Sequence, residues 1–168
     1  VIAAGSQSDE PIINVDFYPT FCEITNAELP KNQPRDGESL LPILLQNKAT
    51  LGDRALFWHF PAYLQSYQRI DGQRDLLYRS RPCSIIRHGH WKLHQYFEDG
   101  AVELYNLEND IGESRDLSSR NPEKAAELLS QLRTWQSEIK APIPTQRNPR
   151  HDPAAEAAAL QDLQRKQS

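Results

Sequence analysis

The chain has 168 residues, with 19 Lys and Arg against 23 Asp and Glu, and a formal net charge of -4. The basic residues are scattered along the sequence, which argues against a nucleic-acid partner. Hydrophobic residues make up 38% of the chain, and no apolar run approaches the ~20 residues that cross a bilayer. We therefore expect a globular segment with no membrane span.

The chain begins Val-Ile-Ala-Ala-Gly, without an initiator Met or the charged and apolar regions of a signal peptide. We therefore expect it to be part of a longer protein. Cys22 and Cys83 are too few for a disulfide scaffold and lack the spacing of a zinc site. Cys22, in an apolar helical stretch, is predicted to be a buried small hydrophobe.

The first predicted helix begins after a connector over residues 1–15. Asp16 is suited to cap its amino terminus, and Pro19 is tolerated in its first turn. The spacing of Phe17, Phe21 and Ile24 places these side chains on one face, which we expect to be buried. The helix is predicted to end at about residue 25.

A loop over residues 26–37 leads to a second, short apolar helix near residues 40–45, with Ser39 as its cap. This block, residues 1–53, is interpreted as the trailing edge of a larger α/β domain. Residues 54–60 then read as a strand. The stretch from Pro61 to Pro82 is polar, and a loop of this length is more often functional than idle.

The strongest local signal lies between residues 83 and 107. Two hairpins are predicted, one turning at His88-Gly89 and one at Asp99-Gly100. Trp91 and Leu93 alternate with His90, Lys92 and His94, so the resulting meander has one apolar and one polar face. The apolar face needs a cover.

A helix over residues 121–140 is predicted to be that cover. It starts with Asn121 as N-cap and Pro122 at the first position, and it stops before Pro142. We expect it to pack through Leu128, Leu132 and Trp135. Together with the strand at 54–60 this gives an α+β fold: the end of an α/β domain, then a four-stranded antiparallel sheet packed against a C-terminal helix over residues 54–141. Residues 142–168 are predicted to be an extended surface tail.

Five short motifs follow one another along residues 1–153: Asp16-Phe17-Tyr18-Pro19-Thr20, the stretch from Arg35 to Pro42, Leu56-Phe57-Trp58-His59-Phe60-Pro61, the stretch from Ser84 to Leu93, and Glu103-Leu104-Tyr105-Asn106-Leu107, with Asp116-Leu117 after an acidic turn. This order resembles the carboxy-terminal third of a type I sulfatase of the alkaline-phosphatase-like superfamily. The resemblance covers nearly the whole chain and rests on the order of the motifs rather than on any one of them.

The resemblance implies that the longer protein hydrolyses sulfate esters with a formylglycine beside a calcium ion. Formylglycine arises in a C-x-P-x-R or C-x-A-x-R motif. Here Cys83 and Arg87 keep that spacing, but Ile85 stands where Pro or Ala is needed, so we interpret the match as chance. No catalytic residue, calcium ligand or formylglycine is expected in this segment, which alone is predicted to be inactive. A periplasmic or secreted location is implied by the resemblance only.

Two polar clusters suggest metal sites. His88, His90 and His94, with Lys92, fall on one face of a hairpin, but His90 and His94 would be about 13 Å apart at ~3.3 Å per strand residue. A solvated polar face is the preferred interpretation. The acidic run Glu108, Asp110, Glu113 and Asp116 lacks the spacing of a calcium loop. We expect turn and capping carboxylates.

His59 and Tyr63 are the predicted substrate-binding residues. His59 stands at the end of a predicted strand, where scaffolds commonly present contact residues, and its imidazole can bind a hydroxyl or a sulfate. Tyr63 is suited to stack on a sugar ring. Sulfatases usually have a second His where this chain has Ala62. A half-buried structural His59 is the alternative.

Four arginines in the long loop add to this site: Arg69, Arg74, Arg79 and Arg81 could bind an anionic ester. A loop kept soluble by its arginines explains them equally well. The expected partners are a sulfated small molecule or carbohydrate and the upstream sulfatase domain. The alternatives are a related phosphonate or phosphodiester hydrolase and a free-standing, non-catalytic binding module that starts near Arg54.

Overall fold

The computed structural model describes residues 2–46, 50–65, 77–146 and 148–165. The chain divides into two compact units, residues 1–54 and residues 55–168. The predicted boundary lay one residue earlier; the assignment of the two units to domains of a longer protein, and of residues 142–168 to a separate tail, stays a prediction. Of the helices in the described part, none combines the length and hydrophobicity that a membrane-spanning segment requires.

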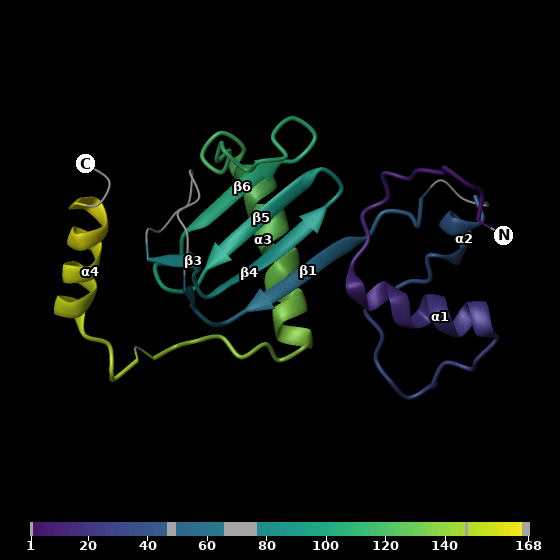
Figure 1. Cartoon of the computed structure of the whole chain (residues 1–168), viewed down its shortest axis with the longest axis horizontal. Coiled ribbons are helices and arrows are strands. Elements are labelled where there is room, and N and C mark those ends of the chain that lie inside the picture. Colours follow the sequence, from purple (N-terminus) through teal and green to yellow (C-terminus); the bar gives the residue numbers. More distant parts are fainter. Residues whose placement is uncertain (1, 47–49, 66–76, 147, 166–168) are drawn as a thin grey trace. The chain divides into compact units, whose positions relative to one another are not determined.

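The first unit contains a 3-10 turn, η1 (Asn14–Asp16), and the helices α1 (Phe17–Thr25) and α2 (Leu41–Leu44) (Figure 1). Its central group is the carboxylate of Asp16, which is fully buried. Both guanidinium nitrogens of Arg54 donate to it at 2.8 Å, and the backbone N–H groups of Ile13 and Glu38 add two further bonds. Burial alone raises the pKa of Asp16, but these hydrogen bonds outweigh it and hold the pKa below its ordinary value.

The contacts of Asp16 correct one prediction. Asp16 precedes α1, but its side chain makes no capping hydrogen bond to the helix, because both carboxylate oxygens are occupied by Arg54 and by backbone groups outside α1. The same contacts show what the segment from Arg35 to Pro42 does: its Glu38 N–H donates to the Asp16 carboxylate. A Cβ on Gly37 would lie only 2.1 Å from the carbonyl oxygen of Val15, so only glycine lets this loop reach Asp16.

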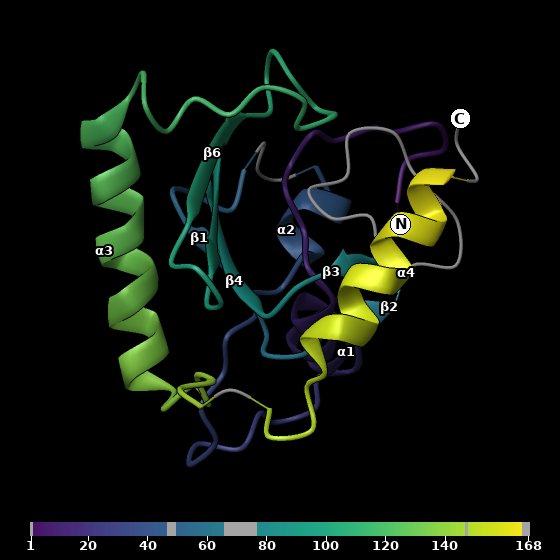
Figure 2. The same cartoon turned by 90° about the vertical axis from the view of Figure 1, so that its left-hand side faces the viewer.

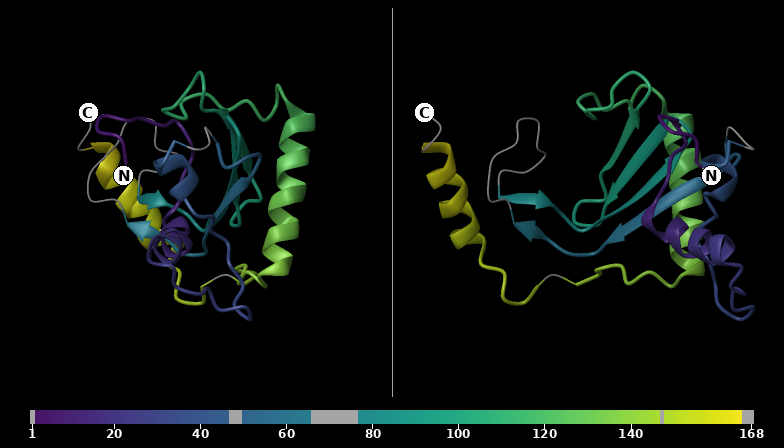
Figure 3. Two further views of the ribbon diagram at one scale, coloured as in Figure 1. Left: turned by 90° about the vertical axis from the view of Figure 1, so that its right-hand side faces the viewer. Right: turned by 45° about the vertical axis from the view of Figure 1, so that its right-hand side comes forward.

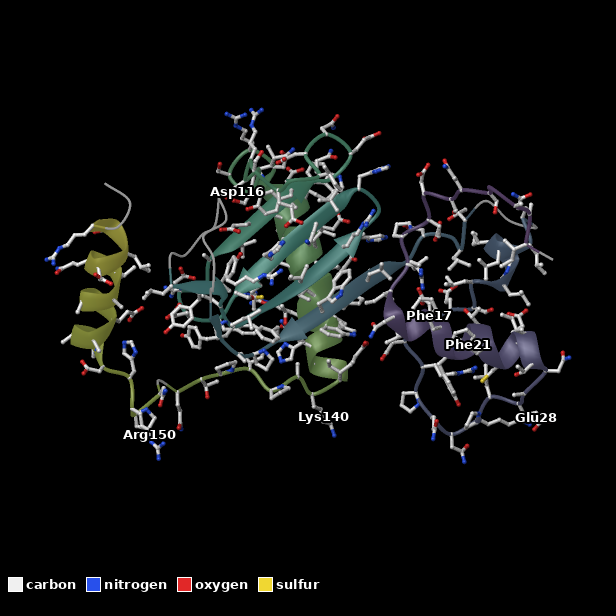
Figure 4. All side chains as sticks on the ribbon, viewed as in Figure 1. Phe17, Phe21, Glu28, Asp116, Lys140 and Arg150 are labelled. Atoms are coloured by element: carbon white, nitrogen blue, oxygen red, sulfur yellow. The ribbon has the colours of Figure 1, made fainter. Side chains whose placement is uncertain are left out.

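The buried face of α1 also differs from the prediction. Pro19 and Thr20 are buried, and the Thr20 hydroxyl accepts a hydrogen bond from the backbone N–H of Leu40 at 2.9 Å. Phe17, Phe21 and Ile24 are 45%, 61% and 51% exposed; Figure 4 labels the two phenylalanines on α1. In this unit the buried positions of α1 are Pro19 and Thr20, because the Thr20 hydroxyl bridges to the loop before α2.

The second unit is built on a four-stranded antiparallel sheet of order β1-β4-β5-β6, whose strands are β1 (Ala55–Phe60), β4 (Cys83–His88), β5 (Trp91–Tyr96) and β6 (Val102–Asn106). A two-stranded ribbon of β2 (Leu64–Gln65) and β3 (Tyr78–Ser80) lies in the chain between β1 and β4. The two predicted hairpins are confirmed. Gly89 and Gly100 have φ values of 58° and 71° in their turns, a conformation that glycine adopts without steric cost.

Helix α3 (Pro122–Glu138) covers one face of this sheet, as Figures 2 and 3 show. The predicted cover is therefore confirmed. Its core consists of three strand residues and three helix residues: Ile86, Leu93, Leu104, Ala125, Leu128 and Leu132. The ring of Trp135 stacks on Phe57 with 4.8 Å between ring centroids. Asn121 stands at the N-cap position but makes no side-chain capping bond, and Pro122 begins the helix.

The last described helix, α4 (Pro153–Arg165), has no buried residue. Its sequence, rich in alanine, favours a helix through intrinsic propensity rather than through packing. Asp152 supports its first turn, because its carboxylate accepts the backbone N–H groups of Ala154 and Ala155.

Candidate functional site

His59 lies near the end of β1, where it pairs across the sheet with Ser84 of β4. Its Nδ1 is 2.7 Å from the Ser84 hydroxyl oxygen, and Ser84 is fully buried. Strand alternation places His59 on the same face as Phe57, the side that α3 covers. The hydrogen bond holds the imidazole ring in one orientation on that face.

The other ring nitrogen of His59 is the unusual feature. Nε2 is buried and has no hydrogen-bond partner among the described residues. A buried polar atom without a partner costs ~1–3 kcal/mol, so such an atom calls for an explanation. The ring of Phe97 lies beside the imidazole, with 5.7 Å between centroids. Nδ1 is therefore committed to the fold, while Nε2 makes no hydrogen bond to a described residue.

Tyr63 follows β1 and is 47% exposed. Its hydroxyl donates to Glu98 at 3.0 Å, and its ring lies 4.8 Å from that of Tyr78, tilted by 52°. Arg81 forms an ion pair with the same Glu98 and sits over the Tyr78 ring at 5.7 Å. Tyr63 thus belongs to a cluster of two rings, one guanidinium and one carboxylate.

The structure brings both predicted residues to the same end of the sheet. The link is the turn after β5, because Phe97 contacts His59 and the next residue, Glu98, contacts Tyr63. The sequence alone did not single out Ser84, Phe97, Glu98 or Tyr78. The only signal for Phe97 and Glu98 was their place beside the Asp99-Gly100 turn, which faces the end of β1 once the strands pair.

Two of the four predicted arginines, Arg69 and Arg74, lie outside the described residues. Arg79 is exposed in β3, and Arg81 follows that strand. Both line a small cavity together with Tyr78 and Ser80. Arg79 and Arg81 therefore lie at one cavity, and Arg81 also belongs to the cluster around Tyr63.

Cys83 begins β4 and is buried. Burial raises the pKa of its thiol, and a weak contact with the Ser80 hydroxyl at 4.0 Å only partly offsets this. A thiol held in its protonated form is a poor nucleophile. This environment agrees with the interpretation of the Cys83-to-Arg87 spacing as chance.

The histidine cluster differs from the prediction. His88 lies on the α3 side of the sheet, where Nδ1 is 3.1 Å from the Gln131 amide oxygen, and His90 lies in the turn between β4 and β5. Lys92 and His94 lie on the opposite face, and both bind Glu113, at 2.5 and 2.8 Å. The proposed shared face for all three histidines is wrong, because the hairpin turn separates them.

Glu113 is the residue that the sequence interpretation underestimated. The hydrogen bond from His94, followed by that from Lys92, lowers the pKa of Glu113 to about 2 despite partial burial.

On the same face the hydroxyls of Tyr96 and Tyr105 both donate to Glu103 at 3.0 Å. Burial, followed by the charge of Glu103, raises the pKa of both phenols.

Two other carboxylates of the acidic loop, those of Asp110 and Asp116, bind backbone groups, as predicted. Asp110 accepts the N–H groups of Ser114 and Arg115. Asp116, labelled in Figure 4, accepts the N–H groups of Leu104 and Ser118. In the part of the chain that the structure describes, no group of three or more His, Cys, Asp or Glu side chains is arranged to hold a metal ion.

Residues 1–141 match the family model described as N-sulphoglucosamine sulphohydrolase, C-terminal. The chain belongs to this sulfatase family. A relative named Sulfatase, from Formosa agariphila, is 36% identical over 146 residues, which cover 79% of this chain and 24% of that protein. Human steryl-sulfatase is 39% identical over 67 residues, which cover 39% of this chain and 11% of that protein. The resemblance inferred from the five motifs is confirmed.

Among solved structures, BT4656 in complex with its substrate D-glucosamine-2-N,6-O-disulfate has a TM-score of 0.61 and 25% sequence identity, over 88% of this chain and 28% of that chain. The α+β fold is therefore that of a sulfatase C-terminal region. The chain spans less than a third of the length of each of these three proteins. This chain thus corresponds to one portion of a sulfatase.

Proposed function

We propose that this chain is the C-terminal part of an enzyme that hydrolyses sulfate esters, and that its substrate is a sulfated carbohydrate. The observation that carries the proposal is the match of residues 1–141 to the sulfatase family. The carbohydrate class is supported by BT4656, whose substrate is a disulfated glucosamine. A periplasmic or secreted location belongs to the same proposal and rests on the resemblance alone.

The proposal divides the chemistry between this segment and the rest of the protein. Formylglycine arises from a cysteine or serine in its own motif, whereas Cys83 is followed by Ile85 at the critical position and is buried, which raises the pKa of its thiol. Three carboxylates of the acidic loop are occupied: those of Asp110 and Asp116 by backbone groups, and that of Glu113 by Lys92 and His94. These residues do not fit a formylglycine or a calcium site, so we assign both to other parts of the longer protein.

Within this segment we propose that His59 and Tyr63 contact the substrate. Nδ1 of His59 is held by Ser84, which leaves Nε2 as the nitrogen that donates to or accepts from a hydroxyl or sulfate oxygen. Tyr63 presents an exposed ring at the same end of the sheet. Neither residue takes part in bond cleavage. Both help the enzyme to distinguish one sulfated substrate from another.

The test uses the longer enzyme and compares two substrates, a sulfated glucosamine and a small aryl sulfate that lacks the sugar hydroxyls. His59→Ala is expected to lower kcat/KM for the sulfated sugar by about three- to tenfold, the equivalent of one lost hydrogen bond. The rate on the aryl sulfate should change little. Ser84→Ala serves as the matched control, because it removes the same internal hydrogen bond but retains Nε2.

The outcomes separate recognition from scaffolding. If Ser84→Ala reproduces the whole effect of His59→Ala on both substrates, His59 acts through the stability of the sheet and the substrate-contact role fails. Absence of sulfate release from any sulfate ester by the longer enzyme, with hydrolysis of a phosphonate or phosphodiester instead, would overturn the sulfatase assignment itself.

A further inference from the structure

A small cavity lies on the sheet face opposite α3, between β3 and the strands β4 and β5. Its volume is about 140 Å³. Cys83 and Ile85 form its apolar floor, and His94 and Tyr96 form one wall. The segment from Tyr78 to Arg81 forms the other wall. The cavity is thus bounded by residues that are far apart in the sequence and that only the folded sheet brings together.

The lining of this cavity favours an anion. Among the described residues that line it are two arginines and one histidine, and none is Asp or Glu. The carboxylates nearby are engaged with other side chains: Glu98 with Tyr63 and Arg81, Glu113 with Lys92 and His94, and Glu103 with Tyr96 and Tyr105. Arg79 forms no ion pair with any described residue. Within the described part of the chain, the charge of Arg79 is therefore not neutralised by a carboxylate, which favours an anionic ligand.

The size and shape of the cavity narrow the ligand further. A pocket for a whole drug-sized ligand measures ~300–1,000 Å³, so about 140 Å³ suits one substituent of a larger molecule. A guanidinium group offers a planar fork of donors that matches the oxygens of a sulfate. Tyr78 lines the cavity, and the half-exposed ring of Tyr63 lies beside it with 4.8 Å between ring centroids, so the two aromatic side chains offer apolar surface to a sugar ring next to the cavity.

We propose that this cavity binds the sulfo group of a sulfated sugar unit. Arg79 and Arg81 bind the sulfate oxygens, and the sugar ring lies against Tyr78 and Tyr63. The ligand class rests on the proposed function; the anionic character of the site does not. Binding here is recognition without bond cleavage, and it favours saccharides that carry a sulfo group at this position over unsulfated ones.

The test titrates the full 168-residue chain with N-acetylglucosamine 6-sulfate and follows binding by calorimetry and by amide NMR shifts. Unsulfated N-acetylglucosamine and sodium sulfate at equal ionic strength are the comparison probes. The sulfated sugar is expected to bind at least about tenfold more tightly than either, because only it engages both the arginines and the rings. The shifts should centre on residues 78–85 and 94–96.

Variants distinguish this cavity from diffuse electrostatic attraction. Arg79→Gln is expected to weaken binding about tenfold. Its matched control is Arg87→Gln, which removes the same charge from the same face of the sheet at the far end of β4, where the Arg87 Nε reaches the carbonyl of Gly89. That control should change binding less than about twofold. Tyr78→Leu, which removes a ring that lines the cavity, should weaken binding of the sulfated sugar but not of sulfate.

Three results would overturn the inference: no binding of the sulfated sugar, equal binding of the unsulfated sugar, or equal losses in Arg79→Gln and Arg87→Gln. Circular dichroism of each variant checks that the fold is retained, and the comparison of probes on the unsubstituted chain stands even if a variant fails to fold. If the sulfated sugar does not bind but the longer enzyme hydrolyses sulfate esters, only the cavity proposal is overturned. If the sulfated sugar binds but the longer enzyme hydrolyses no sulfate ester, only the sulfatase proposal is overturned.

Discussion

The two faces of the four-stranded sheet are made by the same strands but are stabilised in different ways. On one face Ile86, Leu93 and Leu104 align across three strands and are sealed by α3. On the other, Lys92 and His94 converge on Glu113, and two tyrosines converge on Glu103. The first face is held by apolar burial, and the second by carboxylates that each bind two side chains.

This difference separates the structural role of the domain from its functional role. The α3 face contains the fully buried side chains, which fix the register of the strands. The opposite face retains charge, a cavity and two arginines at one end. His59 lies on the α3 face near the end of β1, where its Nδ1 binds Ser84 while Nε2 remains without a described partner. The most direct way to test the comparison is to weaken each face in turn.

The largest effect is expected from the apolar face. Leu132 of α3 is fully buried against the sheet, and removal of a buried leucine side chain costs ~2–5 kcal/mol through lost burial and the cavity left behind. Leu132→Ala should lower the free energy of unfolding by that amount in urea denaturation. Ile139→Ala, at a position 45% exposed just after the helix, should change it by less than ~0.5 kcal/mol. Equal effects would show that α3 does not close the core.

The apolar face was also the part that the sequence could predict. Alternating apolar residues in the strands, two glycine turns and the spacing of Leu128, Leu132 and Trp135 are local patterns, and all correspond to observed elements. Local periodicity also marked Phe17, Phe21 and Ile24 as one face of α1, and this face is exposed within this unit. Periodicity identifies an apolar stripe on a helix, but it does not say whether the stripe or the opposite side is buried within this unit.

The polar face was harder to predict because its partners come from distant segments. Glu113 lies 19 residues beyond His94 along the chain, in a loop whose other carboxylates only cap turns. No spacing rule distinguishes it from Asp110. Likewise, Arg79 and Arg81 were predicted as binding residues, but the cavity that gives them a place depends on how β3 meets β4 and β5.

A medium effect is expected from the polar face when Glu113 is changed to Gln. The variant keeps the shape of the side chain but removes the charge that binds Lys92 and His94. Hydrogen bonds to charged groups contribute ~1.5–3 kcal/mol, and the free energy of unfolding should fall within that range at neutral pH. Glu108→Gln, at an exposed position in the same loop, is the control and should have little effect. No loss in Glu113→Gln, or a loss in Glu108→Gln as large as that in Glu113→Gln, would contradict the role assigned to the Glu113 carboxylate.

The contribution of the Glu113 carboxylate to stability is also expected to depend on pH. The pKa of Glu113 in the folded chain, about 2, is lower than its ordinary value of 4.5. The carboxylate therefore stabilises the fold fully above pH 4.5, and this contribution is lost as the pH falls from 4.5 towards about 2. The difference in stability between the unsubstituted chain and Glu113→Gln should narrow over this interval, as measured by urea denaturation at several pH values. A constant difference would mean that the charge of Glu113 is not the source of the effect.

The smallest effect is expected from the tyrosine pair, and it tests whether a shared carboxylate makes the polar face cooperative. The hydroxyls of Tyr96 and Tyr105 donate to the same oxygen of Glu103. In Tyr96→Phe or Tyr105→Phe the remaining hydroxyl still binds that oxygen, so each change should cost only ~0.5–1.5 kcal/mol. The double variant removes both donors from a partly buried carboxylate and should cost more than the sum of the two. Additive losses in a double-mutant cycle would show that the two hydroxyls act independently, and that the polar face is a set of separate contacts rather than a coupled network.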